Sequence, residues 1–486
     1  PGVAFVTRGP GATNASIGLH VAYQDSQPMV LFVGDVDHTM RDREGFQEMD
    51  FAQFFAPVAK WSARIDDAAR IPEYVARAWS TALSGRPGPV VLALPEDMLH
   101  ETGLTAQPRP AVARPAQAPA PDTMARLMTL LADAHNPVAI IGGAGWDAAA
   151  HEHFAAFAAR IGLPVATAFR RQDAISPATP TYAGNLGYGP NPKLVQRIRD
   201  ADLLLVVAAR LGEATTDGYG LVTPDHPGQV LVHVHPDPEE LGRVYRADLA
   251  ICAAPGDFSA SAARWQDHAI TPSPRGAQAH DEWLAWSTPA PSPQFRIDMG
   301  QCMATARELL PADAIICNGA GNFSGWWHRF WRYHGTPSQL APTSGAMGYG
   351  LPAAVAAALR YPDRCVVAVA GDGDFLMNGQ ELATAAQQGV DLLVLVMDNG
   401  AYGTIRMHQE REYPGRVAST DLANPDFAAL GAAFGAWSVR VETTEQFAEA
   451  LATALPLRGV RLLHCLTDIE QLAASGLTVS ALRAKG

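Results

Sequence analysis

The sequence contains little that would suit a secreted, membrane-spanning or nucleic-acid-binding protein. Only five of its 486 residues are cysteine, none at the spacing of a metal site, which favours a reducing cytoplasm. No apolar run is long enough to span a membrane, and no secretory signal is visible. The net charge is -13 without a basic stripe, so we expect no membrane and no nucleic acid as partners. The chain opens on Pro1 rather than on methionine, and we expect a longer sequence to precede it.

The sequence does contain the composition and patterning of a large α/β protein. It is 48% hydrophobic and 17% charged, and it is long enough for two to four domains. Short β-branched runs alternate with helical segments, which predicts parallel sheets. Proline-rich breaks at 105–121, 271–275 and 289–293 separate three domains. We place these at 1–104 (incomplete at its N-terminus), 122–267 and 295–486.

Several elements are predicted with defined ends. We expect Thr13 and Asn14 to cap the first helix. The predicted helices lie at 71–83, 299–310, 379–388 and 444–454. The predicted strands include 3–7, 29–33, 89–95, 137–141, 203–208, 230–234, 314–317, 365–370, 390–397 and 460–466.

The most informative stretch runs from Cys365 to Ile405. A buried strand ends at Gly371-Asp372-Gly373, a helical segment follows, and a second strand ends at Asp398-Asn399-Gly400. Because the carboxyl ends of parallel strands meet at one sheet edge, we expect Asp372 and Asn399 to face one pocket. An acid and an amide suit Mg²⁺, and the glycine-rich turns suit phosphate. The alternative interpretation is a generic turn with a solvent-exposed aspartate.

This constellation resembles the thiamine diphosphate motif, which starts at GDG and ends at an asparagine one βαβ unit later. The motifs RGPGATN, GFQEMDF and SGAMGYGLP also occur in the order seen in acetohydroxyacid (acetolactate) synthase large subunits, over nearly the whole chain. The resemblance implies three parallel-sheet domains that bind the pyrimidine (1–104), lie centrally (122–267) and bind the diphosphate (295–486). It also implies Mg²⁺ ligands at Asp372, Asn399 and the carbonyl of Ala401.

The same resemblance assigns the remaining site residues. Met347 is the expected wedge that bends thiamine diphosphate, and Phe46 and Gln47 join it as catalytic residues. The cofactor-binding residues would be Asn322, Phe323, Met347, Gly371, Gly373, Asp374, Tyr402, Gly403, Thr404 and Ile405. Gly348 and Tyr349 would border this site, and Gly9, Gly11, Phe46, Gln47 and Lys60 would lie near the substrate side of a neighbouring subunit.

A site shared between subunits implies a homodimer or homotetramer. The aromatic run Trp326, Trp327, Phe330 and Trp331 is compatible either with a contact surface between subunits or with a core.

The implied activity is that of a carboligase or lyase acting on a 2-oxoacid. The bent cofactor would form an ylid, attack the 2-oxoacid carbonyl and act as the electron sink when CO₂ leaves. Acetolactate synthase-like carboligation is the leading hypothesis. One alternative is a 2-oxoacid or 2-hydroxyacyl-CoA decarboxylase or lyase. Another is a cofactor-binding but inactive homologue, because the family's activating glutamate belongs upstream of Pro1, and neither Glu44 nor Glu48 matches it.

Other features depart from the family or lie outside its motifs. His408 stands where the synthases carry a tryptophan, and Asp374 stands where many relatives have a serine. The run after Arg210 is not of the FDDR type, which makes FAD doubtful. IGGAGW (141–146) favours a tight turn over a nucleotide site. HVHPDP (233–238) favours polar residues at a strand end over a metal site.

Overall fold

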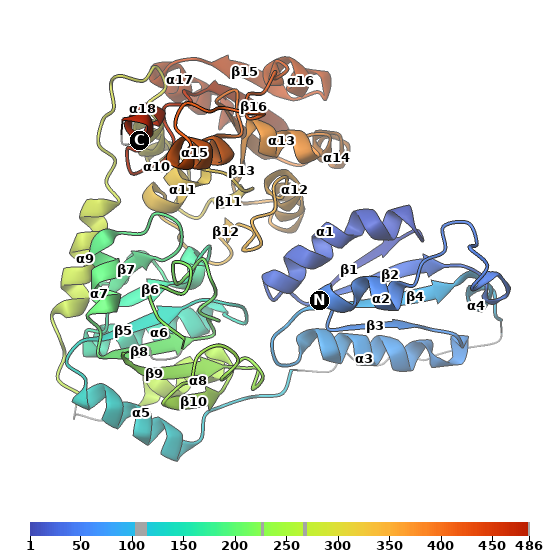
Figure 1. Ribbon diagram of the computed structural model, residues 1–486, viewed down its shortest axis with the longest axis horizontal. Helices are drawn as coiled ribbons and strands as arrows, with labels where there is room; N and C mark the ends of the chain where they lie inside the picture. The colour runs from blue at the N-terminus through green and yellow to red at the C-terminus, as the bar shows by residue number, and fades with distance from the viewer. Residues whose placement is uncertain (103–113, 225–227, 266–269, 485–486) are drawn as a thin grey trace.

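The computed structural model describes residues 1–102, 114–224, 228–265 and 270–484, which form three α/β domains (Figure 1). Domain 1 lies at the right of the view in blue, domain 2 at the lower left in green, and domain 3 above them in orange and red. Each domain contains one sheet, and every pairing between its named strands is parallel. The predicted fold class is therefore confirmed. Residues 105–113 of the linker predicted at 105–121 lie outside the described residues. Within the described residues, no helix is long and apolar enough to cross a membrane.

Domain 1 is a four-stranded sheet in the order β1-β2-β4-β3, with α1 and α2 on one face and α3 and α4 on the other. The prediction that Thr13 and Asn14 cap α1 is wrong. The helix begins at Pro10, whose missing N–H costs nothing at a first helical position. The elements, with η for 3₁₀ helices, are β1 (Gly2–Val6), α1 (Pro10–Gln24), β2 (Met29–Asp35), η1 (His38–Met40), α2 (Phe51–Phe55), η2 (Ala56–Val58), β3 (Trp61–Arg64), η3 (Ala68–Arg70), α3 (Ile71–Leu83), β4 (Pro89–Pro95) and α4 (Glu96–Leu99).

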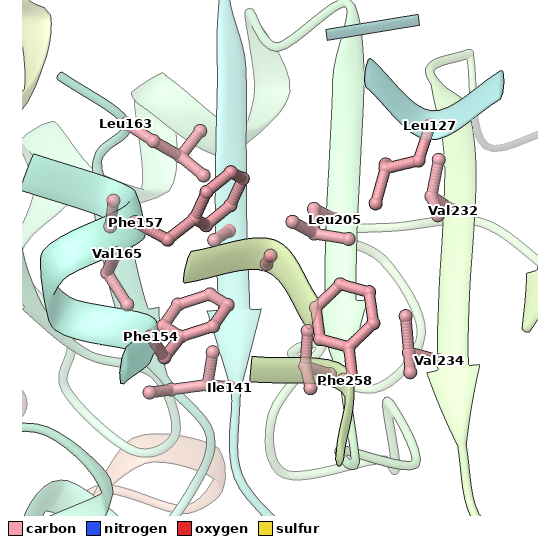
Figure 2. Close-up of a cluster of buried hydrophobic side chains, with 14 of the residues drawn as sticks. Leu127, Ile141, Phe154, Phe157, Leu163, Val165, Leu205, Val232, Val234 and Phe258 are labelled. Carbon is pink, nitrogen blue, oxygen red and sulfur yellow. The ribbon is translucent and has the colours of Figure 1, made fainter. Parts of the chain in front are cut away.

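Domain 2 is a six-stranded sheet in the order β10-β9-β8-β5-β6-β7. Figure 2 shows the core on one face, where phenylalanines of α6 and α8 pack on the aliphatic side chains of β5, β8 and β9. Its elements are α5 (Pro121–Asp133), β5 (Pro137–Ile141), α6 (Ala148–Ile161), β6 (Val165–Thr167), η4 (Gln172–Ala174), β7 (Tyr182–Asn185), α7 (Pro192–Arg199), β8 (Leu203–Val207), β9 (Val230–His235), β10 (Leu249–Cys252), α8 (Pro255–Arg264) and α9 (Arg275–Trp286). Helix α9 packs against β7, with Trp283 edge-on to Tyr182.

Domain 3 is a six-stranded sheet in the order β12-β11-β13-β14-β16-β15. The aromatic run at 326–331 lies in the core of one face, so its interpretation as core is confirmed. The elements are α10 (Met299–Leu309), β11 (Ile315–Asn318), α11 (Ser324–Phe330), β12 (Gln339–Leu340), α12 (Gly350–Arg360), β13 (Val366–Gly371), α13 (Asp372–Asn378), α14 (Glu381–Gln388), β14 (Leu392–Asp398), α15 (Gly403–Glu412), α16 (Phe427–Ala433), β15 (Trp437–Val441), α17 (Thr444–Ala454), β16 (Val460–Leu466) and α18 (Val479–Arg483).

The register of the domain 3 sheet positions the candidate site. Gly371 at the end of β13 pairs with Met397 near the end of β14, and Met397 pairs with Cys465 of β16. The segments that follow β11, β13, β14 and β16 therefore leave the sheet at one edge, the carboxyl edge, where open α/β sheets bind ligands.

Candidate functional site

A cavity of about 270 Å³ lies at the carboxyl edge of the domain 3 sheet. Every residue predicted to bind the diphosphate or the metal lines it, as does Met347. These residues are Asn322, Phe323, Met347, Gly371, Asp372, Gly373, Asp374, Asn399, Ala401, Tyr402, Gly403, Thr404 and Ile405. The parallel pairing of β13 with β14 thus brings Asp372 and Asn399, which follow these strands, to one cavity.

The three predicted metal ligands are joined by one backbone N–H. The Ala401 N–H donates to Asp372 Oδ2 at 3.2 Å and to Asn399 Oδ1 at 3.0 Å. Asp372 Oδ1 accepts the Gly373 N–H at 2.9 Å. A carboxylate, an amide oxygen and a main-chain carbonyl make up an all-oxygen donor set that fits Mg²⁺, which takes few ligands from protein and the rest from phosphate and water.

Asp372 is the first residue of α13, so the predicted loop at GDG is wrong: the strand passes directly into a helix. The acidic residues of this first turn face the positive end of the helix. Gly373 is required here, because a Cβ on it would lie 2.5 Å from the ring of Tyr402. A Cβ on Gly371 would lie 2.9 Å from the Phe323 ring. These glycines let the Tyr402 and Phe323 rings pack closely against the backbone at the start of α13.

Asn424, which was not predicted, contacts the predicted metal ligand Asp372. Its amide Nδ2 donates to Asp372 Oδ2 at 2.8 Å and to Asp398 Oδ1 at 2.7 Å. His464 Nε2 lies 2.9 Å from the other Asp398 oxygen. Burial raises the pKa of Asp372, the Asn424 amide lowers it, and the neighbouring Asp398 raises it further. The two acids form a coupled buried pair that Asn424 bridges.

Asp374 connects two loops of the cavity. Its Oδ1 accepts the N–H of Ala320 at 3.0 Å and that of Gly348 at 2.9 Å, while its Oδ2 is buried without a partner. Only 3% of the residue is exposed, and burial raises its pKa to about 6. A serine, which the resemblance predicts at this position, would offer one oxygen instead of two, so the unpartnered Oδ2 depends on the aspartate.

Two predicted residues, Asn322 and Thr404, are bonded to each other. Thr404 Oγ1 donates to Asn322 Oδ1 at 2.9 Å and accepts the Asn322 N–H at 3.1 Å.

Other cavity residues were missed by the sequence reasoning. Beyond the predicted set, the cavity is lined by Met299, Ala320, Gly321, Trp326, Gly345, Met397, Thr467, Gln471 and Leu472. The last three follow β16, a neighbour of β14, so the strand-end rule could have indicated them.

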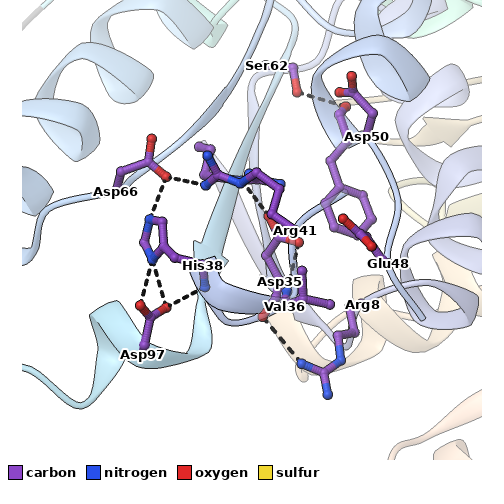
Figure 3. A network of polar contacts seen from close by, with 12 residues as sticks. Arg8, Asp35, Val36, His38, Arg41, Glu48, Asp50, Ser62, Asp66 and Asp97 are labelled. Carbon is purple, nitrogen blue, oxygen red and sulfur yellow. Dashed lines mark hydrogen bonds and ion pairs between the residues drawn. The ribbon is translucent and has the colours of Figure 1, made fainter. Parts of the chain in front are cut away.

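The domain 1 candidates lie at a different place. Gln47 lines a separate cavity of about 770 Å³, and Phe46 is 77% exposed. Gly9 packs against the loop that carries Phe46 and Gln47, because a Cβ on Gly9 would lie 2.8 Å from Gln47 Cβ. Figure 3 shows the carboxyl edge of the domain 1 sheet beside this loop. One chain therefore does not bring Phe46 and Gln47 to Met347.

The polar network of Figure 3 surrounds His38. Its Nδ1 lies 2.7 Å from an Asp97 oxygen and its Nε2 lies 3.0 Å from Asp66, which also pairs with Arg41. Glu48 accepts the N–H groups of Asp42 and Gly45, so its carboxylate is engaged by its own loop.

Lys60 lies just before β3, at the amino edge of the sheet. Its ammonium donates to the carbonyls of Thr81 and Ser84 at the end of α3, at 2.6 and 2.5 Å.

The remaining departures have plain structural positions. His408 is exposed on α15 and does not line the cavity. Arg210 donates to the Gln24 carbonyl of domain 1 at 2.7 Å. The turn at 142–146 precedes α6. It is closed by Trp146 Nε1, which donates to the Gly142 carbonyl. His233 contacts the Ala209 carbonyl, and the described residues hold no cluster of three or more His, Cys, Asp or Glu suited to a metal.

Comparison with known proteins agrees with this geometry. Three models match the chain: the N-terminal TPP binding domain of thiamine pyrophosphate enzymes at residues 1–54, their central domain at 124–261 and their C-terminal TPP binding domain at 319–465. The chain therefore belongs to the thiamine pyrophosphate enzyme family.

Within this family the chain is similar to acetolactate synthase large subunits. It is 32% identical over 468 residues to that of Parasynechococcus marenigrum, a match that covers 93% of this chain and 75% of the relative. It is 30% identical over 483 residues to the isozyme 2 large subunit of Escherichia coli, covering 96% of this chain and 84% of the relative. To the large subunit of Corynebacterium glutamicum it is 30% identical over 479 residues, covering 93% and 74%.

Proposed function

We propose that this protein is a Mg²⁺- and thiamine diphosphate-dependent enzyme that acts on 2-oxoacids by acetolactate synthase-like carboligation. The observation that carries the proposal is the junction of Asp372, Asn399 and Ala401 beside a glycine-lined cavity. The similarity to acetolactate synthase large subunits supports the choice of substrate class. Five free thiols fit the predicted cytoplasmic location. FAD is not part of the proposal.

In this proposal, different residues of the cavity would bind the cation, orient the diphosphate and pack against the cofactor. Asp372, Asn399 and the Ala401 carbonyl would hold the cation, which would supply positive charge beside the diphosphate. The N–H groups at the start of α13 and the Asn322–Thr404 pair orient the diphosphate. Met347 lines the same cavity and would pack against the cofactor as the predicted wedge. The bound cofactor supplies a nucleophilic carbon and an electron sink for loss of CO₂.

We also propose that two copies of the chain complete one site. Met347 and the metal ligands line a cavity of domain 3, whereas Gln47 lines a cavity of domain 1. A second copy that presents its domain 1 to this cavity would unite them in a homodimer or homotetramer. Mixing a Gln47→Ala chain with an Asp372→Ala chain should then restore activity, since some mixed dimers hold one intact site. A monomer by light scattering with cofactor bound would contradict the proposal.

The proposal is tested by calorimetry and by product analysis. Thiamine diphosphate should bind only with Mg²⁺, and Asp372→Ala should weaken binding by more than about a hundredfold because it removes the charged ligand. A panel of 2-oxoacids should then release CO₂ and give a new carbon–carbon bond when an acceptor 2-oxoacid or aldehyde is present. Release of CO₂ without a coupled product would support the decarboxylase alternative. Binding without turnover would support the inactive homologue.

A further inference from the structure

The segment that carries Met347 is held by side chains from all three domains. It runs from Pro342 to Gly348, between β12 and α12, and reaches the cavity at Gly345 and Met347. A side chain can bend a ligand only if its own position is fixed, because a mobile side chain would move away from the ligand instead. The contacts of this segment therefore decide whether Met347 can act as one.

Domain 1 holds the segment through Asp25. Asp25 Oδ1 accepts the Thr343 N–H at 2.8 Å and also the Thr343 hydroxyl. Asp25 is the C-cap residue that follows α1, where the helix dipole disfavours a carboxylate. A carboxylate at this unfavourable position is explained by its two bonds to Thr343 rather than by the stability of α1.

Domain 2 holds the segment through Arg170. Arg170 Nη1 donates to the Pro342 carbonyl, and only 7% of the residue is exposed. Its backbone has a φ of 57°, a left-handed conformation that non-glycine residues adopt at a cost. Arg170, which contacts Pro342, therefore combines a strained backbone conformation with a buried guanidinium.

Domain 3 holds the end of the segment through its own side chains. Asp374 Oδ1 accepts the Gly348 N–H, and Asn378 Nδ2 donates to the Gly348 carbonyl at 3.0 Å. The same Asp374 oxygen accepts the Ala320 N–H of the loop that leads to Asn322. Met347 is thus anchored on its C-terminal side within domain 3. On its N-terminal side, Thr343 and Pro342 are bonded to domains 1 and 2, just after β12, which pairs with β11 of domain 3.

We propose that Asp25 and Arg170 are positioning residues for Met347: by fixing Pro342 and Thr343, they set how far the wedge projects into the cofactor cavity. The proposal rests on the proposed function, because it assigns the wedge a cofactor to bend. It makes the docking of domains 1 and 2 on domain 3 a condition for a correctly shaped site. It differs from a purely structural role, in which these contacts would hold the domains together without affecting Met347.

The test follows the ε-methyl group of Met347 by nuclear magnetic resonance in protein labelled with ¹³C-methyl methionine, without cofactor. The signal is assigned with Met347→Leu. Asp25→Ala and Arg170→Leu should shift and broaden it, while Asp25→Asn and Arg170→Lys, which keep an acceptor or a cation, should leave it near its original position. Thr343→Val, which removes only the hydroxyl bond, should give a smaller shift and provides a milder variant if the others fold poorly.

The matched control is Arg210→Met, which removes another bond between domains 1 and 2, to Gln24 beside Asp25. It should leave the Met347 signal unchanged. Calorimetry with Mg²⁺ and thiamine diphosphate should show about tenfold weaker binding for Asp25→Ala, the effect of losing hydrogen bonds to a charged group.

An unchanged Met347 signal in Asp25→Ala and Arg170→Leu, or the same change in Arg210→Met, would overturn the inference. Failure of the unaltered protein to bind the cofactor would overturn the proposed function instead, since the methyl measurement does not depend on it.

Discussion

Replacing Asn424 by alanine removes a side chain that bridges the proposed metal ligand Asp372 and its acidic neighbour Asp398. The amide donates to both carboxylates, at 2.8 and 2.7 Å. Asp372 keeps two backbone donors, Gly373 at 2.9 Å and Ala401 at 3.2 Å, so its position is loosened rather than lost. Loss of a residue that orients a metal ligand costs about 10- to 100-fold in metal affinity, or about 1.4–2.7 kcal/mol.

The loss should depend on pH in a defined direction. Mg²⁺ binds the carboxylate form of Asp372, whose pKa is raised by burial and lowered by the Asn424 amide. Without the amide the pKa rises further, and a larger share of Asp372 is protonated near pH 6 than near pH 8. The affinity deficit of Asn424→Ala should therefore be greater at pH 6 than at pH 8.

Titration calorimetry of Mg²⁺ in the presence of thiamine diphosphate at both pH values measures this deficit. The control is Asn191→Ala, which removes the cap of α7 in domain 2 and costs about 1 kcal/mol of stability without touching the site. Equal Mg²⁺ affinity in Asn424→Ala and the unaltered protein would refute the reasoning. A deficit that is the same at both pH values would refute the part of the reasoning that concerns the protonation of Asp372.

Three further predictions concern stability. The hydrogen bond to Arg483 lowers the pKa of Glu410 to about 2, so its contribution is present above the unfolded pKa of about 4.3 and lost as the pH falls through 2. Glu410→Gln should lower the melting temperature at pH 7 more than at pH 3. The hydrogen bond to Asp97 raises the pKa of His38, so its contribution is full below about pH 6.5 and lost as the pH rises through the folded value. Thermal unfolding of His38→Gln should show a larger deficit at pH 5.5 than at pH 8.5. Phe157→Ala should cost about 3–5 kcal/mol in denaturant unfolding, since Phe157 is buried in the domain 2 core (Figure 2).

The sequence predicted elements well where local signals and tertiary packing agree. Strand β4 was predicted with its observed ends, Pro89 and Pro95, because a continuous apolar run lies between residues that interrupt it. Helix α17 was predicted from its amphipathic pattern, and Thr443 caps it. Strand β14 begins at Leu392 rather than at 390, because Asp391 accepts the Gly459 N–H and belongs to a turn contact. No local pattern reveals such a distant partner.

The candidate site divides in the same way. Asp372 and Asn399 could be placed together because both follow strands of one parallel sheet, and the sheet fixes where strands end. Asn424 could not, because it lies in an irregular segment between α15 and α16 whose path depends on packing. Asp25 and Arg170 could not either, since their contact with the Met347 segment depends on how whole domains meet.

The three-domain anchoring of Pro342–Gly348 has a consequence for how the protein is made. The contact from Asp25 spans 318 residues of sequence and that from Arg170 spans 172, whereas that from Asp374 spans only 26. Long-range contacts form late in folding, because the chain must first pay the entropy of closing the loop between them. The part of the cavity that domain 3 builds by itself can therefore form as that domain folds. The Pro342–Gly348 segment reaches its final position only after domain 3 has joined domains 1 and 2.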